Sequence, residues 1–315
     1  MKMKKIFIAA LMALLSAGFA SAQTMEEATE LYNTGATMLN TGDNNGALDY
    51  FEQALTMGET IGPDATELIN NCKDIIPKIH LAIAKEYASV QDSENAAKEL
   101  EETIAIAKEY NNADVLSEAT SLLPQVLMQQ AGILLNGKQF AEAAEAYKEV
   151  TEVQPENAIA WLRMGMAYGA AQNTEAAVAA YTKAAELGQA DQANKQLSNL
   201  YLIAAVNAQK AKDWAGVIEN AEAAISYLDN FNAQKLIGVA ALQLGQNEKA
   251  IAGFENYLAL QPNAKDKSQI YYQIATAYNN MGNKGQACTY FKMIVDDPNF
   301  GEYAKHMVEN ELKCQ

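Results

Sequence analysis

The sequence predicts an all-α protein built from about seven repeated helical hairpins, and three observations support this class. A triplet of a small, a second small and then a large residue recurs along the chain, at spacings of twelve and four residues. Helical periodicity fits the segments around it, because Ala177, Tyr181 and Ala184 share one helix face. Turn-forming runs such as 41–43 (Thr-Gly-Asp) and 282–284 (Gly-Asn-Lys) separate the two helices of a hairpin.

Close crossing of two helices explains the triplet. A small residue on each helix lets the backbones approach, and a large residue one turn later fills the adjacent gap. The first small residues are Gly35, Ala84, Ala131, Gly165, Ala205, Gly238 and Ala275. The second small residues are Ala47, Ala96, Ala143, Ala177, Val217, Ala250 and Ala287, and the third positions are Phe51, Leu100, Tyr147, Tyr181, Ala221, Phe254 and Phe291. Val217 and Ala221 make the fifth hairpin the weakest match.

These residues resemble a known repeat family. The fourth hairpin reads Trp161-x-x-Met164-Gly165-x-x-Tyr168, followed by Ala177, Tyr181 and Ala184, and it is similar to the tetratricopeptide repeat signature. Two further segments match the second half of that signature: Phe140, Ala143, Tyr147 and Pro155, and then Ala250, Phe254 and Pro262. The resemblance implies a right-handed α-α superhelix, a solenoid in which every hairpin packs on its neighbours.

The hairpins are expected near residues 28–61, 77–110, 124–157, 158–191, 198–230, 231–264 and 268–300. A capping helix over 301–315 is expected to cover the last hairpin and present polar residues to water, as the end of a solenoid requires. One continuous array over 23–315 is therefore predicted, although length alone favours about two domains.

The first helices of the second and third hairpins are expected to extend backward by about three to four turns. The apolar residues before Pro77 and those before Pro124 follow the same helix-face pattern: Leu68, Ile69, Cys72, Ile75 and Ile76 in one, Val115, Leu116, Ala119, Leu122 and Leu123 in the other. Proline removes a backbone donor and clashes with the preceding turn. We therefore expect a kink at Pro77 and Pro124, or a break into two helices.

Residues 1–22 have the pattern of a cleaved secretory signal peptide. Three lysines precede an apolar run over 6–15, and Ala20-Ser21-Ala22 forms an A-x-A cleavage pattern. The run is short for a membrane span, and an uncleaved N-terminal anchor is the alternative. We expect an exported protein, periplasmic or secreted, with no membrane span after the leader. The mature chain would carry 20 basic and 39 acidic residues, a net charge of −19 instead of −16.

Composition argues against several classes of function. The acidic balance disfavours nucleic-acid binding through the general surface, because phosphate contacts need Lys and Arg. The chain has one arginine, Arg163, and two histidines, His80 and His306, and it lacks a P-loop and a calcium loop. We therefore expect no catalytic activity, no cofactor and no metal site.

Cysteines and histidines add one hypothesis. Cys288 lies on the second helix of the last hairpin and Cys314 on the cap, so a disulfide between them is a hypothesis for an exported chain; two buried free thiols are the alternative. Cys72 is expected in the core. His80 takes the hairpin position of Trp161, which favours packing over ligation, and acidic residues such as Glu99, Glu101 and Glu102 are expected on solvated helix faces.

In the family, five positions of each first helix line a concave groove. Carried onto the last three hairpins, the resemblance implies these candidate binding residues: Asn199, Gln209, Lys210, Asn232, Lys235, Gln243, Gln269, Tyr272, Asn279 and Asn280. Their amides can hydrogen-bond an extended peptide or a sugar. The carboxylate-clamp form of the repeat is not supported, because Val239 takes the place of its asparagine after Lys235. A groove that only faces solvent is the alternative.

The combined prediction is a non-catalytic, exported scaffold or adaptor that binds an unidentified protein or peptide in the cell envelope. Repeat arrays offer long concave surfaces suited to such association, but the fold does not fix the function. The alternative is a glycan- or cell-wall-binding accessory protein of an envelope system, which a cluster of exposed aromatic side chains would favour.

Overall fold

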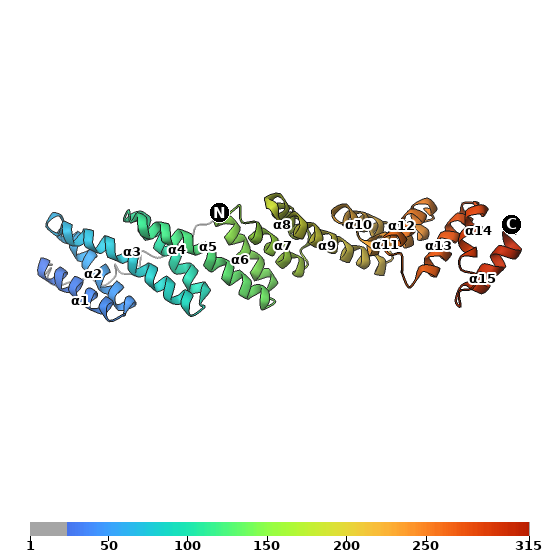
Figure 1. Cartoon of the computed structure of the whole chain (residues 1–315). Coiled ribbons are helices and arrows are strands. Elements are labelled where there is room, and N and C mark those ends of the chain that lie inside the picture. Colours follow the sequence, from blue (N-terminus) through green and yellow to red (C-terminus); the bar gives the residue numbers. More distant parts are fainter. Residues whose placement is uncertain (1–23, 315) are drawn as a thin grey trace. The chain divides into compact units, whose positions relative to one another are not determined.

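The computed structural model describes residues 24–314, which form helices and turns without a β-strand (Figure 1). The predicted all-α class is confirmed. The predicted signal peptide, residues 1–22, lies outside the described residues. The chain divides into two compact units between Gln130 and Ala131, within helix α5. We call residues 24–130 the N-terminal unit and residues 131–314 the C-terminal unit, and each is described by itself.

The N-terminal unit consists of paired helices joined by short turns. Its helices are α1 (Met25–Asn40), α2 (Asn44–Ile61), α3 (Thr66–Ser89), α4 (Ser93–Glu109) and the first part of α5 (Ala113–Asn136). Aspartates begin the second helix of each hairpin, because their carboxylates accept bonds from otherwise unpaired N–H groups. Asp43 accepts from the N–H of Gly46 at 2.9 Å, and Asp92 accepts from that of Asn95 at 3.2 Å.

Helices α3 and α5 confirm the predicted backward extension and contain Pro77 and Pro124 in their interiors. The alternative of a break into two helices is wrong, since each helix is continuous through its proline. In α3 the buried face continues on both sides of Pro77, with Cys72 and Ile76 before it and Ile79 after it. Burial of this face compensates for the hydrogen bond that the proline removes.

The C-terminal unit repeats the hairpin from α6 onward. Its helices are α6 (Phe140–Val153), α7 (Ala158–Ala170), α8 (Thr174–Ala184), α9 (Ala190–Lys210), α10 (Trp214–Tyr227), α11 (Phe231–Gln243), α12 (Asn247–Leu260), α13 (Lys267–Asn280), α14 (Lys284–Lys292) and α15 (Gly301–His306). A kinked helical segment, Ala185–Gln189, joins α8 to α9, and there Gly188 adopts a φ of +98° that favours glycine.

The small–large pairs lie where the sequence predicts them, at the crossing of two helices. A Cβ atom on Gly165 of α7 would lie 2.6 Å from a ring carbon of Tyr181 on α8. A Cβ atom on Gly238 of α11 would likewise lie 2.6 Å from the ring of Phe254 on α12. Both rings are buried, so only glycine permits these helices to approach so closely.

The predicted cap packs against the last hairpin but contains a shorter α-helix than the sequence predicts. Helix α15 ends at His306, and a wider helical turn, Met307–Glu311, follows. Ala304 and Met307 are buried in one apolar cluster with Phe291 of α14. Among the described residues, none of the helices combines the length and hydrophobicity needed to cross a membrane.

Candidate functional site

The ten predicted groove residues all lie on the first helices of three successive hairpins, α9, α11 and α13. The exposed members are Asn199, Lys210, Asn232, Gln243, Gln269 and Asn280, and the half-buried ones are Gln209, Lys235, Tyr272 and Asn279. Their roles in binding remain predictions, but the structure separates those engaged within the protein from those free to meet a ligand.

Three exposed amides form the most regular feature of this surface. Asn199, Asn232 and Gln269 occupy the same position, the second, in three successive hairpins. Stacked repeats place equivalent residues in a row. Among the described residues, none of these three side chains makes a hydrogen bond to another protein group. Each amide therefore keeps its donors and its acceptor available.

Lys235 is engaged within the protein. Its Nζ pairs with the Asp266 carboxylate at 2.5 Å, and the Tyr257 hydroxyl donates to the same carboxylate at 2.7 Å. Burial opposes ionisation of Asp266, but the bonds from Lys235 and Tyr257 outweigh it and hold the Asp266 pKa below its usual range. Burial and the bond to Asp266 raise the pKa of Tyr257 to about 12. This cluster joins α11, α12 and the start of α13.

Tyr272 is also engaged, as part of an aromatic cluster. Its ring centroid lies 5.2 Å from that of Phe300 and 5.5 Å from that of Tyr303. The ring of Phe291 lies 6.3 Å away in an edge-on arrangement. These contacts attach α13 to the cap, since ring pairs at such distances stabilise packing.

Exposed aliphatic residues outside the ten predicted ones lie on the first helices α7 and α9. Ile159 and Met166 of α7 are 48% and 41% exposed, and Ile203 of α9 is 60% exposed. Ile159 and Met166 lie seven residues apart and share one helix face with Arg163 between them. Ile159 takes the second position of its hairpin, as Asn199 does in the next. Applying the same positions to the fourth hairpin would have found it.

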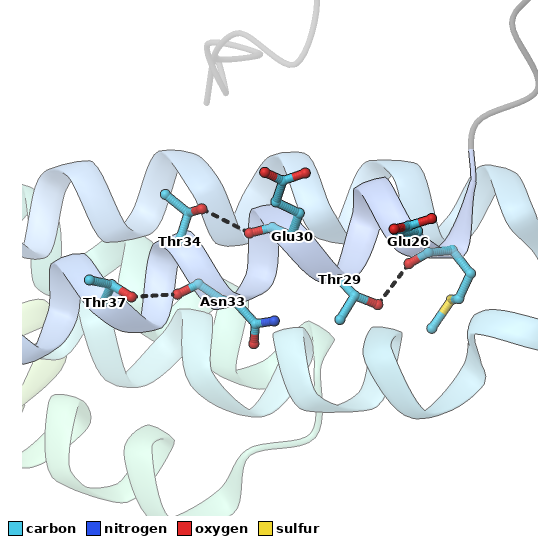
Figure 2. Close-up of a pocket in the computed structure, with 7 residues that line it drawn as sticks. Glu26, Thr29, Glu30, Asn33, Thr34 and Thr37 are labelled. Carbon is cyan, nitrogen blue, oxygen red and sulfur yellow. Dashed lines mark hydrogen bonds between the residues drawn. The ribbon is translucent and has the colours of Figure 1, made fainter.

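A surface depression lies elsewhere, along one face of α1 (Figure 2). It has a volume of about 800 Å³ and a lining of threonines, glutamates, an asparagine and Met25. The hydroxyls of Thr29, Thr34 and Thr37 each donate to a backbone carbonyl one turn earlier. Because these bonds use the hydroxyl protons, the depression offers few free donors to a ligand.

His80 is buried, as predicted for a packing position, and its ring also has a polar partner. It is 4% exposed, and its Nδ1 lies 2.6 Å from Oε1 of Glu99. Glu102, one turn further along α4, lies in the same group, in which all ligand atoms are within 4.8 Å of one another. These glutamates were expected on a solvated face, because the spacing predicts the hairpin but not which side chains of α3 and α4 meet across it.

The structure contains the disulfide that was a hypothesis from the sequence. Cys288 of α14 and Cys314 are bonded, with their Cα atoms 5.7 Å apart. Cys72 is a buried free thiol, as expected for a core residue, and burial raises its pKa to about 11.

Models of the tetratricopeptide repeat match three segments, residues 124–157, 158–190 and 269–299. No protein with a curated description matches the chain.

Solved structures with related folds have low sequence identity. YrrB, described as a TPR protein with an unusual peptide-binding site, is 16% identical, with 57% of this chain and 90% of that chain covered and a TM-score of 0.34. A tetratricopeptide repeat protein from Parabacteroides merdae is 14% identical, with 90% and 98% covered and a TM-score of 0.27. PilW, a type IV pilus biogenesis factor, is 15% identical, with 61% and 95% covered and a TM-score of 0.28. Values this low say nothing about ligands, so the assignment rests on the family models. The helical hairpins and the three matched segments together show that this chain contains tetratricopeptide repeats.

Proposed function

We propose that this protein is a non-catalytic scaffold that binds an extended segment of a partner protein along the first helices α9, α11 and α13. Tetratricopeptide repeats support a role as a protein–protein interaction scaffold. The observation that carries the finer proposal is the row formed by Asn199, Asn232 and Gln269, whose exposed amides have no partner within the described part of the chain. An extended peptide presents a backbone N–H and a C=O at every residue, and such amides bond both.

The surface offers both amide groups and small apolar groups, which favours a partner segment with polar and apolar residues. Val239 and Thr276 lie at a shared position of α11 and α13 and are half-buried, so they offer small apolar contacts beside the amides. Lys235 is excluded from direct recognition in this proposal, because it is already paired with Asp266. The proposed binding residues are therefore the amides, with Lys235 acting only to hold α11 to the start of α13.

We also propose that the protein acts outside the cytoplasm, in the cell envelope. This part rests on the leader pattern of residues 1–22. Its test is the N-terminal sequence of the protein recovered from cell fractions. A mature chain that begins at Gln23 in the exported fraction supports the proposal, and an uncut chain in the cytoplasm contradicts it.

The predicted single array over 23–315 remains a proposal as well. Its test is limited proteolysis of the native protein. Two long-lived fragments produced by a cut near Gln130 would contradict one array, and degradation without such a pair would support it.

The peptide proposal is tested by capture from an envelope extract with the triple variant Asn199→Ala/Asn232→Ala/Gln269→Ala. The wild type is expected to retain a specific partner, and the variant is expected to lose it by at least about tenfold, as expected from two or more lost hydrogen bonds. The matched control is Glu142→Ala/Glu219→Ala/Glu248→Ala, which truncates three exposed side chains on second helices. Equal recovery by wild type and both variants would exclude this surface.

The alternative of a glycan-binding accessory protein receives no added support. Sugar sites use exposed aromatic faces, and Tyr272, the aromatic residue of the predicted groove, has its ring packed against Phe300 and Tyr303. The same capture experiment separates the two functions when the partner is treated with protease before mixing. Loss of binding supports the peptide proposal, and retention supports the glycan.

A further inference from the structure

We propose that His80, Glu99 and Glu102 form a binding site for a divalent transition-metal cation of the Zn²⁺ class. The three residues come from the two facing helices of one hairpin in the N-terminal unit: His80 from α3, and Glu99 and Glu102 from α4. The site is independent of the proposed peptide-binding surface, which lies on other hairpins.

The geometry already approaches that of a coordination shell. One ligand atom from each residue lies within 4.8 Å of those of the other two, and Nδ1 of His80 lies 2.6 Å from Glu99. Two ligands of a tetrahedral zinc ion are separated by about 3.3 Å, given metal–ligand bonds of about 2.0–2.1 Å. Small rotations of the two glutamate side chains therefore suffice, and the cation would replace the hydrogen between His80 and Glu99.

The chemistry of the donors favours this class of ion. A neutral imidazole nitrogen with carboxylate oxygens is a combination that binds Zn²⁺ and similar cations. The two carboxylates carry the charge that a divalent ion neutralises. Glu52 of α2 interacts electrostatically with both His80 and Glu102, so a third carboxylate lies near the site. In the absence of a cation these acidic groups repel one another.

His80 is the buried member of the group. The residue is 4% exposed, and its Nε2 is buried without a hydrogen-bond partner. A buried polar ring in this state is costly. The ion would bind at Nδ1, where it takes the place of the hydrogen bond to Glu99. Glu102, by contrast, is exposed and gives an ion a route from solvent.

Such a site would fasten α3 to α4 at a position that the fourth hairpin fills with the ring of Trp161. Binding to the folded chain alone stabilises it, so Zn²⁺ is expected to slow hydrogen exchange in α3 and α4. Helices of the C-terminal unit, such as α11 and α12, serve as the internal reference in the same sample.

The test is titration of the chelator-treated full-length protein with Zn²⁺ alone, followed by calorimetry. We expect one Zn²⁺ per chain, with affinity reduced at least about tenfold in His80→Gln, Glu99→Gln and Glu102→Gln. Glu101→Gln is the matched control, because Glu101 lies between the two ligands on α4 but is exposed and outside the group. His306→Gln is the control for the second histidine, which is exposed on the cap.

A second variant decides the outcome if the first one does not fold. If His80→Gln fails to fold, as judged by circular dichroism, the exposed position Glu102 still decides, since its amide variant preserves size. Unchanged Zn²⁺ affinity in Glu102→Gln, loss of the ion in His306→Gln, or no binding by the wild type at millimolar Zn²⁺ would each overturn the site.

Discussion

The N-terminal and C-terminal units use the same glycine–phenylalanine pair at a helix crossing, but the glycine lies closer to the ring in the C-terminal unit. In the first hairpin, a Cβ on Gly35 would lie 3.1 Å from the ring of Phe51. In the sixth hairpin, a Cβ on Gly238 would lie 2.6 Å from the ring of Phe254. Both rings are fully buried. An added methyl group would therefore require a smaller shift of the Phe51 ring in the first hairpin than of the Phe254 ring in the sixth.

A second pair of equivalent positions differs in polarity. Trp161 of the fourth hairpin packs in an apolar cluster and donates its Nε1–H to the carbonyl of Pro155 at 2.8 Å. His80 of the second hairpin is buried beside Glu99. One hairpin thus uses the position for packing, and the other uses it for a polar group. Repeats tolerate such exchange because each hairpin contacts mainly its neighbours.

The largest expected difference in stability between the two units comes from the disulfide, which lies in the C-terminal unit. The Cys288–Cys314 bond joins residues 26 apart, and closing a loop of that size stabilises a fold by about 3 kcal/mol. Reduction, or Cys288→Ser, is expected to lower hydrogen-exchange protection in α13 to α15 and to leave α1 and α2 unchanged. Thiol counting on denatured, unreduced protein should find one free thiol, that of Cys72; three free thiols would disprove the bond.

Two glycine-to-alanine substitutions, with a smaller expected effect on stability, test how closely each glycine is packed against its ring. Gly238→Ala is expected to destabilise the C-terminal unit by about 1–3 kcal/mol, because the methyl group displaces the buried Phe254 ring. Gly35→Ala is expected to cost less than about 1 kcal/mol, because the gain in helix propensity offsets the milder crowding. Residue-resolved hydrogen exchange measures each hairpin separately, which a chain of two units requires. Equal losses at both sites would remove the contrast.

The smallest effect concerns ion pairs that join neighbouring hairpins. The folded-state pKa of Asp266 is held low, so its stabilising contribution is present above about pH 4 and is lost as the pH falls through the folded value. Asp266→Asn should reduce the acid-induced loss of protection in α11 to α13, by less than about 1 kcal/mol. The exposed pair Lys85–Glu118 of the N-terminal unit is the control, and Glu118→Gln should have a still smaller effect. A larger effect of Glu118→Gln would contradict this order.

Local sequence was sufficient to place most of the hairpins. Helices α7 and α11 begin at Ala158 and Phe231, the predicted starts of their hairpins. Their bounds follow from residues a few positions apart: the apolar face, the turn and the capping side chain. The joint between α8 and α9 was not predicted, because the helical segment Ala185–Gln189 continues the pattern across a kink at Gly188.

The candidate sites were predicted less completely, for a physical reason. The amide row follows from one repeated position in each hairpin, so Asn199, Asn232 and Gln269 could be found from the sequence. The engagement of Lys235 with Asp266 could not, because it depends on how the start of α13 lies against α11. The same holds for His80 and Glu99, which are nineteen residues apart and on different helices.

The sequence by itself determined the repeated hairpin, its small–large crossing pairs and the acidic character of the chain. These properties depend on the spacing and type of neighbouring residues. Only the tertiary structure decided which polar side chains are already paired and which stay free. It also decided whether a buried ring such as that of His80 packs against apolar groups or pairs with a carboxylate. Those outcomes depend on distances between helices, which the periodicity of a single helix does not encode.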